Sequence, residues 1–234
     1  MSNHSDEYLE RQYLVSSFDV AERIDALVEA AVPPNSPNAA LYREMMQTVA
    51  RMAEADRSRW DAKIMMQTLR ELEASFELLD RFKRRRKVTV FGSARTPVEH
   101  PLYQQAKELG EILARRNLMV ITGAGNGIMA AAHEGAGPDN SLGLNIVLPF
   151  EQGANPTMQE RAHHLLTFHF FFLRKLFFVK EADALVLCPG GFGTLDEAWE
   201  VLTLIQTGKS PLVPVVLLDV EGGTYWDKCL EFMR

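Results

Sequence analysis

Short apolar runs alternate with helical patterns from residue 87 to the end of the chain. The runs are nearly unbroken in valine, isoleucine and leucine, which is typical of strands buried on both faces of a sheet. The segments between them carry apolar residues at steps of three and four, the period of an amphipathic helix. Five runs are expected to form strands, at residues 87–94, 118–125, 141–150, 183–191 and 212–220. This order predicts an α/β fold: a Rossmann-like, doubly wound parallel sheet with helices on both faces.

The chain before residue 87 has a different pattern. A polar leader and a linker-like "VPPNSPN" (32–38) precede a long helical stretch. One helix face is predicted to carry Trp60, Ile64, Thr68, Leu72, Phe76 and Leu79, together with Met45, Met46, Met52, Met65 and Met66. We therefore divide the chain into an N-terminal leader and helical extension (1–86) and a Rossmann-like domain (87–234), with the helix packing on that domain or on another subunit.

A run of cations, "KRRRK" (83–87), is expected to close this helix, because cations suit a helix C-terminus. An anion-binding or nucleic-acid role for the run is the alternative. At the other end, "YWDKCLEFMR" stops inside a helical pattern, which leaves open a further helix beyond Arg234.

Composition narrows the class of protein. A chain of 234 residues with 47% hydrophobic and 24% charged residues is ordinary for a globular protein. The net charge of -6 gives no overall attraction for nucleic acid, and two cysteines are too few for a disulfide framework. The N-terminus lacks a secretory pattern, and Arg174 and Lys175 interrupt the most apolar stretch, "FHFFFLRKLFFV". We expect a cytoplasmic protein with neither nucleic-acid nor membrane partners.

Three glycine-rich loops follow predicted strands: "FGSA" (91–94), "TGAGNGIM" (122–129) and "PGGFGT" (189–194). In a doubly wound sheet, ligands bind outside the carboxyl ends of the strands, and glycine lets the backbone approach an anion closely. The three loops together predict a phosphate site. In the second loop, Gly123 and Gly125 are followed at position 128 by isoleucine, where the dinucleotide fingerprint G-x-G-x-x-G needs glycine, and no P-loop is present. NAD-dependent oxidoreductases and ATPases are therefore disfavoured.

The motifs resemble those of the LONELY GUY (LOG) family of cytokinin-activating phosphoribohydrolases, often mislabelled lysine decarboxylases. "PGGFGTLDE" matches the P-G-G-x-G-T-x-x-E signature, and "GAGNGIM", the Arg-Lys pair and "LTLIQTGK" extend the match over residues 88–227. The longer form with "PFEQGAN" looks like the bacterial branch. The resemblance implies hydrolysis of the N-glycosidic bond of a nucleoside 5'-monophosphate, AMP or an N6-substituted cytokinin-type AMP, to free base and ribose 5-phosphate.

By this resemblance the catalytic residues are Glu197 and Arg174. A carboxylate beside the anomeric carbon can stabilise or attack an oxocarbenium-like sugar, and a guanidinium suits phosphate or purine hydrogen bonding. The alternative for Glu197 is a T-x-x-E capping box with Thr194. The alternative for Arg174 and Lys175 is that the two cations snorkel to solvent at the edge of a helix.

The resemblance also implies a set of substrate-binding residues, with the Gly193 and Thr194 amides on the 5'-phosphate and Ser93 as a further phosphate donor. A family glutamate falls on Pro156 here, so Glu151 is preferred over Glu160 as its replacement near the ribose. The substrate-binding set is Ser93, Gly125, Gly127, Met129, Glu151, Lys175, Gly190, Gly191, Phe192, Gly193, Thr194 and Thr203.

No cofactor and no metal is expected. Three histidines, His163, His164 and His169, lack nearby acids other than Glu160, and no lysine lies in a pyridoxal phosphate motif. A nucleotide- or molybdenum-cofactor-binding protein of the same fold remains the competing class. A homodimer is expected, with the aromatic helix around Phe170–Phe178 at or near the interface; the alternative is that the N-terminal helix covers this surface.

Overall fold

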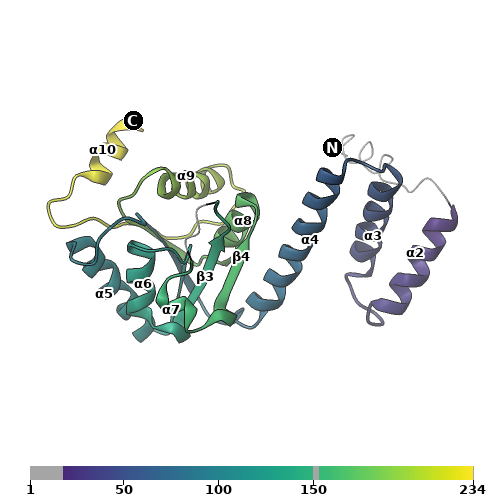
Figure 1. Cartoon of the computed structure of the whole chain (residues 1–234), viewed down its shortest axis with the longest axis horizontal. Helices are drawn as coiled ribbons and strands as arrows, with labels where there is room; N and C mark the ends of the chain where they lie inside the picture. The colour runs from purple at the N-terminus through teal and green to yellow at the C-terminus, as the bar shows by residue number, and fades with distance from the viewer. Residues whose placement is uncertain (1–17, 150–152, 234) are drawn as a thin grey trace. The chain divides into compact units, whose positions relative to one another are not determined.

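The computed structural model describes residues 18–149 and 153–233 (Figure 1). The chain forms two compact units, Met1–Met66 and Gln67–Arg234. The boundary falls inside helix α4 (Arg59–Asp80), whereas the sheet begins at Lys87. Within the described ranges, no helix has both the length and the apolar character needed to cross a membrane.

The first unit contains helices α2 (Phe18–Ala31) and α3 (Ala39–Glu54), joined by the expected linker. Ile24 and Val28 of α2 are buried, and Arg43 of α3 pairs with Asp25 of α2. The sequence pattern did not predict α2. The prediction that Met45, Met46 and Met52 share a helix with Trp60 was wrong. They lie on α3, because the chain leaves the helix after Glu54 and Asp56 adopts a left-handed conformation (φ 39°).

The second unit is built on a six-stranded sheet in the order β4-β3-β2-β1-β5-β6. Every pairing is parallel; Val88, for example, lies opposite Val120 on one side and Ala184 on the other. The strands are β1 (Lys87–Phe91), β2 (Met119–Thr122), β3 (Ser141–Ile146), β4 (Leu165–Phe168), β5 (Ala184–Leu187) and β6 (Val215–Leu217). The predicted Rossmann-like class is confirmed. The strand order reverses between β1 and β5, which is the usual ligand position in such sheets.

The prediction of five strands missed β4. This strand has only four residues, "LLTF", and it lies at the edge of the sheet, where Thr167 is exposed. An edge strand lacks the unbroken apolar run of a central strand. Its sequence also merges with the aromatic residues that follow, so the pattern gave no boundary.

Helices cover both faces of the sheet (Figure 1). Helices α5 (Pro101–Arg115) and α6 (Ile128–Ala136) pack on one face, against Val88, Val90 and Val120. The opposite core contains Ile121, Leu185 and other strand residues. It is covered by α8 (Phe171–Glu181), α9 (Phe192–Gln206), α10 (Tyr225–Phe232) and the end of α4. Short helical turns lie at Pro138–Asn140, α7 (Pro156–Gln159) and Ala162–His164. Neighbouring strand residues thus face opposite cores, as the pleat requires.

The last part of α4 belongs to this second core. Leu79 is buried there, and the ring of Phe76 packs edge-on against Phe177 of α8 with centroids 5.5 Å apart. The helix ends at Asp80, before the cationic run that was expected to close it. The final cation of the run, Lys87, is buried as the first residue of β1.

Candidate functional site

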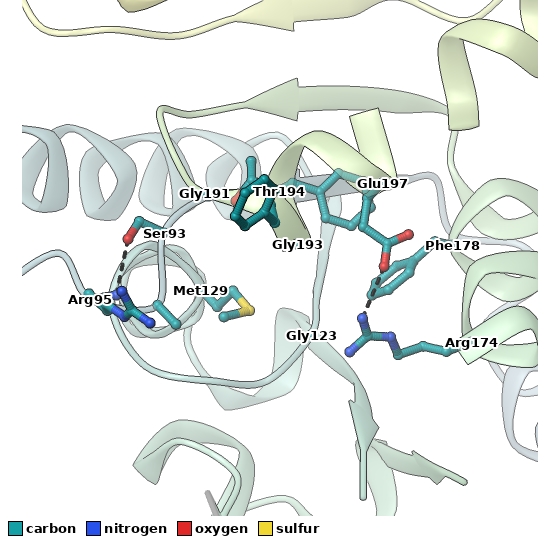
Figure 2. Close-up of a pocket in the computed structure, with 14 residues that line it drawn as sticks. Ser93, Arg95, Gly123, Met129, Arg174, Phe178, Gly191, Gly193, Thr194 and Glu197 are labelled. Atoms are coloured by element: carbon teal, nitrogen blue, oxygen red, sulfur yellow. Dashed lines mark hydrogen bonds and ion pairs between the residues drawn. The ribbon is translucent and has the colours of Figure 1, made fainter. Parts of the chain in front are cut away.

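A pocket of about 530 Å³ lies at the carboxyl ends of the central strands, a size that suits a small-molecule ligand (Figure 2). It is lined by the loop after β1 (Gly92–Arg95), by Gly123 after β2, and by Gly191–Thr194 after β5. All three glycine-rich loops therefore contribute to one pocket. It opens at the reversal of strand order between β1 and β5.

Backbone contacts of Ser93 tie these loops together. Its N–H donates to the carbonyl of Pro189 (3.2 Å), and its carbonyl accepts from the N–H of Ile128 at the start of α6 (3.0 Å). Gly127, the N-cap of α6, has φ 62°, and a Cβ there would lie 2.3 Å from the Ser93 oxygen. Only glycine allows both this conformation and this approach.

A buried polar network supports the loop after β2. The Asn155 side-chain amide donates to the carbonyl of Gly125 (3.0 Å) and contacts Nδ1 of His133 (3.2 Å), while Nε2 of His133 lies 3.2 Å from the Leu142 carbonyl. Complete burial lowers the pKa of His133 to about 4, so the ring is neutral at physiological pH. Ala124, whose carbonyl accepts from the Asn155 N–H, holds a left-handed conformation (φ 59°). The network fixes a loop that would otherwise be strained.

Glu197 lies on α9, on the helix face turned toward the pocket, and its residue surface is only 5% exposed. The N-cap of α9 is Gly191, with no side-chain hydrogen bond, so Thr194 is the third residue inside the helix. The capping-box alternative was therefore wrong: Thr194 is not an N-cap and Glu197 is not its partner. A different explanation is needed for a carboxylate buried at this place.

The partner of Glu197 is Arg174 of α8, whose Nη2 donates to Oε1 of Glu197 at 2.9 Å. The guanidinium also lies over the rings of Phe171 and Phe178, with 5.0 Å and 5.4 Å to the centroids. Buried Nε of Arg174 has no hydrogen-bond partner among the described residues. Snorkelling does not describe this side chain, which is 13% exposed and points into the pocket (Figure 2).

Burial controls the protonation of Glu197. Loss of hydration raises the pKa of its carboxyl group, and the nearby charge of Asp196 raises the pKa further. Arg174 and Lys175 lower the pKa but do not outweigh burial. The pocket thus holds a carboxylate that binds a proton more readily than an exposed glutamate does.

Lys175, next to Arg174, pairs with a different part of α9. Its Nζ contacts Asp196 at 2.8 Å and Glu200 at 2.7 Å. Burial alone would lower the pKa of Lys175, but the hydrogen bonds to these two carboxylates dominate and raise the pKa. The two adjacent cations of α8 thus pair with different carboxylates of α9. Only Arg174 and its partner Glu197 line the pocket.

The structure brings together part of the predicted site. Residues that line the pocket are Ser93, Met129, Arg174, Gly191, Phe192, Gly193, Thr194 and Glu197. Residues that do not line it are Gly125, Gly127, Lys175, Gly190 and Thr203. Thr203 is exposed farther along α9, and Glu151 lies outside the described residues. Gly190 instead makes room for its neighbour, since a Cβ there would lie 2.1 Å from Oγ1 of Thr194.

Sequence reasoning missed several residues of the pocket. Arg95 and Gly123 lie in the glycine-rich loops, and Phe91 and Phe178 provide aromatic walls. A Cβ at Gly123 would lie 3.0 Å from Sδ of Met129 and 3.7 Å from Nη1 of Arg174, so a larger side chain would enter the pocket. Arg95 could have been found as a cation directly after "FGSA". Phe178 could not, because it is one of many aromatic residues on α8.

The three candidate metal-binding histidines make contacts with other protein groups, and the rings of His163 and His164 pack edge-on with centroids 4.6 Å apart. Nδ1 of His164 lies 3.0 Å from the Ser141 carbonyl, and Nδ1 of His169 lies 2.7 Å from Oε1 of Glu71. In the part of the chain that the structure describes, no three potential metal ligands gather into a site.

Comparisons with known proteins place this site in a family. A family model described as "Possible lysine decarboxylase" matches residues 126–234. The chain is 35% identical over 154 residues to the probable cytokinin riboside 5'-monophosphate phosphoribohydrolase LOGL5 of Oryza sativa subsp. japonica; the match covers 63% of this chain and 59% of that protein. It is 32% identical over 153 residues to cytokinin riboside 5'-monophosphate phosphoribohydrolase LOG3 of Arabidopsis thaliana, covering 63% of this chain and 67% of that protein.

Among solved structures, the molybdenum cofactor binding protein of Rippkaea orientalis is 22% identical, with a TM-score of 0.47, over 64% of this chain and 85% of that one. The Arabidopsis relative, in contrast, is 32% identical over about two thirds of its own length. The chain belongs to the LOG family.

Proposed function

We propose that this protein hydrolyses the N-glycosidic bond of a nucleoside 5'-monophosphate, AMP or an N6-substituted cytokinin-type AMP. Water adds across the bond, so the products are the free base and ribose 5-phosphate. The observation that carries the proposal is the Arg174–Glu197 pair inside a pocket of glycine-rich loops. The rice and Arabidopsis relatives are named for this type of reaction.

Glu197 is proposed to act as the carboxylate beside the anomeric carbon. As the bond to the base breaks, positive charge develops on the sugar, and an ionised carboxylate stabilises it or attacks the carbon. Arg174 keeps Glu197 in place through the 2.9 Å contact. Because burial raises the pKa of Glu197, the rate should fall as the pH drops through that pKa and the carboxylate is protonated.

The phosphate is proposed to bind between Ser93 and the start of α9. Oγ of Ser93 accepts from the N–H of Arg95 (3.1 Å), which leaves the hydroxyl proton free to be donated. The N-terminus of α9 offers the backbone N–H groups of Phe192 and Gly193 and a favourable dipole. Contacts to the phosphate would supply binding energy that a nucleoside cannot provide.

The direct test is incubation with AMP and, separately, with adenosine, followed by chromatography of the products. We expect adenine and ribose 5-phosphate in equal amounts from AMP, and at least about 100-fold slower release of adenine from adenosine. Equal turnover of the two compounds would contradict the proposal. Tight AMP binding without release of adenine would instead favour the nucleotide-binding class, and a panel of N6-substituted nucleotides would identify the preferred base.

We also propose that the working unit is a homodimer formed through α8. Phe171, Phe172 and Leu176 of this helix are 49%, 57% and 47% exposed, although Phe177 and Phe178 are buried, with Leu72 and Leu79 of α4 in the same core. The covering-helix alternative accounts for Phe177, against which Phe76 of α4 packs, and leaves the three exposed residues uncovered. Sedimentation at low micromolar concentration should show a dimer, and Phe172→Glu should dissociate it; a fully active monomer would contradict the proposal.

A further inference from the structure

The side chain of Arg95 is a cation of the pocket that has no polar partner among the described residues. It lies in the loop after β1 and lines the pocket, together with Ser93 and Ala94. Through residues 18–149 and 153–233, no hydrogen bond or ion pair engages its guanidinium; its one polar contact is the backbone N–H that donates to Ser93. A guanidinium has five donors in a fixed fork that matches the oxygens of phosphate. This one is therefore free to bind a ligand.

The charges that line the pocket do not balance. Among its described lining residues, the ionisable side chains are Arg95, Arg174 and Glu197. Arg174 and Glu197 neutralise each other across 2.9 Å. The charge of Arg95 is left over, so the pocket favours a ligand with an anionic group near this residue.

Arg95 also lies across the pocket from the residues of the proposed chemistry (Figure 2). In Figure 2, Ser93 and Arg95 lie on one side of the pocket, Arg174 and Glu197 lie on the other, and Met129 lies between them. An anionic group held by Arg95 would leave the rest of an elongated ligand to extend toward Glu197. A phosphate monoester attached to a sugar has this shape and charge distribution.

Some of the backbone N–H groups at the pocket are already hydrogen-bonded and cannot donate to a phosphate. The N–H of Thr194, expected to bind phosphate, already donates to the carbonyl of Gly191 at 3.1 Å. The N–H of Ile128 at the start of α6 is taken by the Ser93 carbonyl. Two of the amides at the glycine-rich edge are therefore occupied, and a flexible cation beside them can supply the missing donors.

We propose that Arg95 is a specificity-determining residue that binds the 5'-phosphate and selects nucleotides over uncharged nucleosides. This inference rests on the proposed function, since it names the group of the substrate that Arg95 recognises. Arg95 does not take part in bond cleavage. Its removal should weaken binding of the phosphate and leave the reactivity of a bound sugar nearly unchanged.

The test measures binding in a variant whose turnover is strongly reduced. Calorimetry would follow AMP, adenosine and ribose 5-phosphate in Glu197→Gln and in Glu197→Gln/Arg95→Gln. We expect the Kd for AMP and for ribose 5-phosphate to rise by about 10- to 100-fold when Arg95 is replaced, and the Kd for adenosine to stay the same. Arg95→Lys should give an intermediate loss, because lysine keeps the charge and loses the fork.

Arg84→Gln is the matched control. Arg84 is an exposed arginine in the cationic turn before β1, at the amino edge of the sheet, and its replacement should change none of the three affinities. Unchanged AMP binding in the Arg95→Gln protein would overturn the inference, as would an equal loss for AMP and adenosine. If AMP binds through Arg95 but wild-type protein releases no adenine, the proposed function fails and this inference stands.

Discussion

Two buried ion pairs lie at opposite ends of the strands of the same sheet, one at the amino ends (the amino edge) and one at the carboxyl ends (the carboxyl edge). At the amino edge, Nζ of Lys87, the first residue of β1, contacts Oε2 of Glu181 at 3.0 Å, and the side chains are 4% and 7% exposed. At the carboxyl edge, Arg174 contacts Glu197 at 2.9 Å, and the side chains are 13% and 6% exposed. In distance and in burial the two pairs are nearly the same.

The pKa values of their carboxyl groups are nevertheless shifted in opposite directions. Burial would raise the pKa of Glu181, but hydrogen bonds and charge from Lys180 and Lys87 outweigh it and lower the pKa. At Glu197, burial outweighs Arg174 and Lys175 and raises the pKa. One carboxylate is fixed in its ionised form by two lysines, and the other is held ionised only weakly. The first pair joins β1 to the end of α8; the second faces a pocket, where a reactive carboxylate is useful.

The largest expected effect is on activity at the carboxyl edge. Glu197→Gln keeps the shape of the side chain and removes its charge, so kcat for AMP should fall by about 10²- to 10³-fold, as when one preorganised electrostatic group is removed. Quenched assays with wild type and variant at equal concentration would measure this. Circular dichroism should show an unchanged fold. Activity near the wild-type level would make Glu197 a structural residue like Glu181.

The same substitution at the amino edge should act on stability. Glu181→Gln leaves Lys87 buried without its full counter-charge, so the free energy of unfolding should fall by about 3 kcal/mol. Urea titration would measure the loss, and kcat should be unchanged while the protein is folded. Asp80→Asn is the control, because its pair with Lys83 is exposed and should contribute little. Loss of activity in folded Glu181→Gln would contradict the proposal that this ion pair acts on stability and the Arg174–Glu197 pair on activity.

His133 shows what burial does without a counter-charge. Its pKa is lowered from 6.5 to about 4 in the folded protein, so the unfolded chain binds the proton first as the pH falls. The stability that the neutral His133 ring contributes is therefore complete above pH 6.5. It is lost progressively as the pH falls from 6.5 to about 4. Glutamine does not titrate. Between about pH 7 and pH 5, the free energy of unfolding of His133→Gln should therefore fall by about 2 kcal/mol less than that of the wild type. Equal losses in urea titrations at the two pH values would refute this account.

The smallest effect concerns the surroundings of Glu197. The charge of Asp196 raises the pKa of Glu197, and the Asp196 side chain is 56% exposed. Asp196→Asn should move the acid limb of kcat/KM to lower pH by a few tenths of a pH unit, with a smaller shift at high salt. A shift toward higher pH would show that loss of the Lys175 contact, rather than loss of the negative charge, dominates.

The fold was largely predictable, because buried parallel strands and amphipathic helices have distinct periods. The exceptions were short or atypical: β4 has four residues at the edge of the sheet, and α2 lies in a leader that looked polar. The capping box failed for a related reason. Its residues have the correct spacing, but the helix begins at Phe192, two residues before Thr194.

The sequence by itself determined the alternation of five of the six strands with helices, the glycine-rich loops and the residue types at the site. These depend on local pattern and on motifs that keep their spacing along the chain. Only the tertiary structure decided that Arg174 pairs with Glu197 while Lys175 pairs with Asp196 and Glu200. It also decided that Arg95 lines the same pocket with no side-chain partner among the residues that the structure describes. The physical reason is that pairing and pKa depend on distance and burial. Both are set by how β1, α8 and α9 pack, and no local pattern in the sequence records that packing.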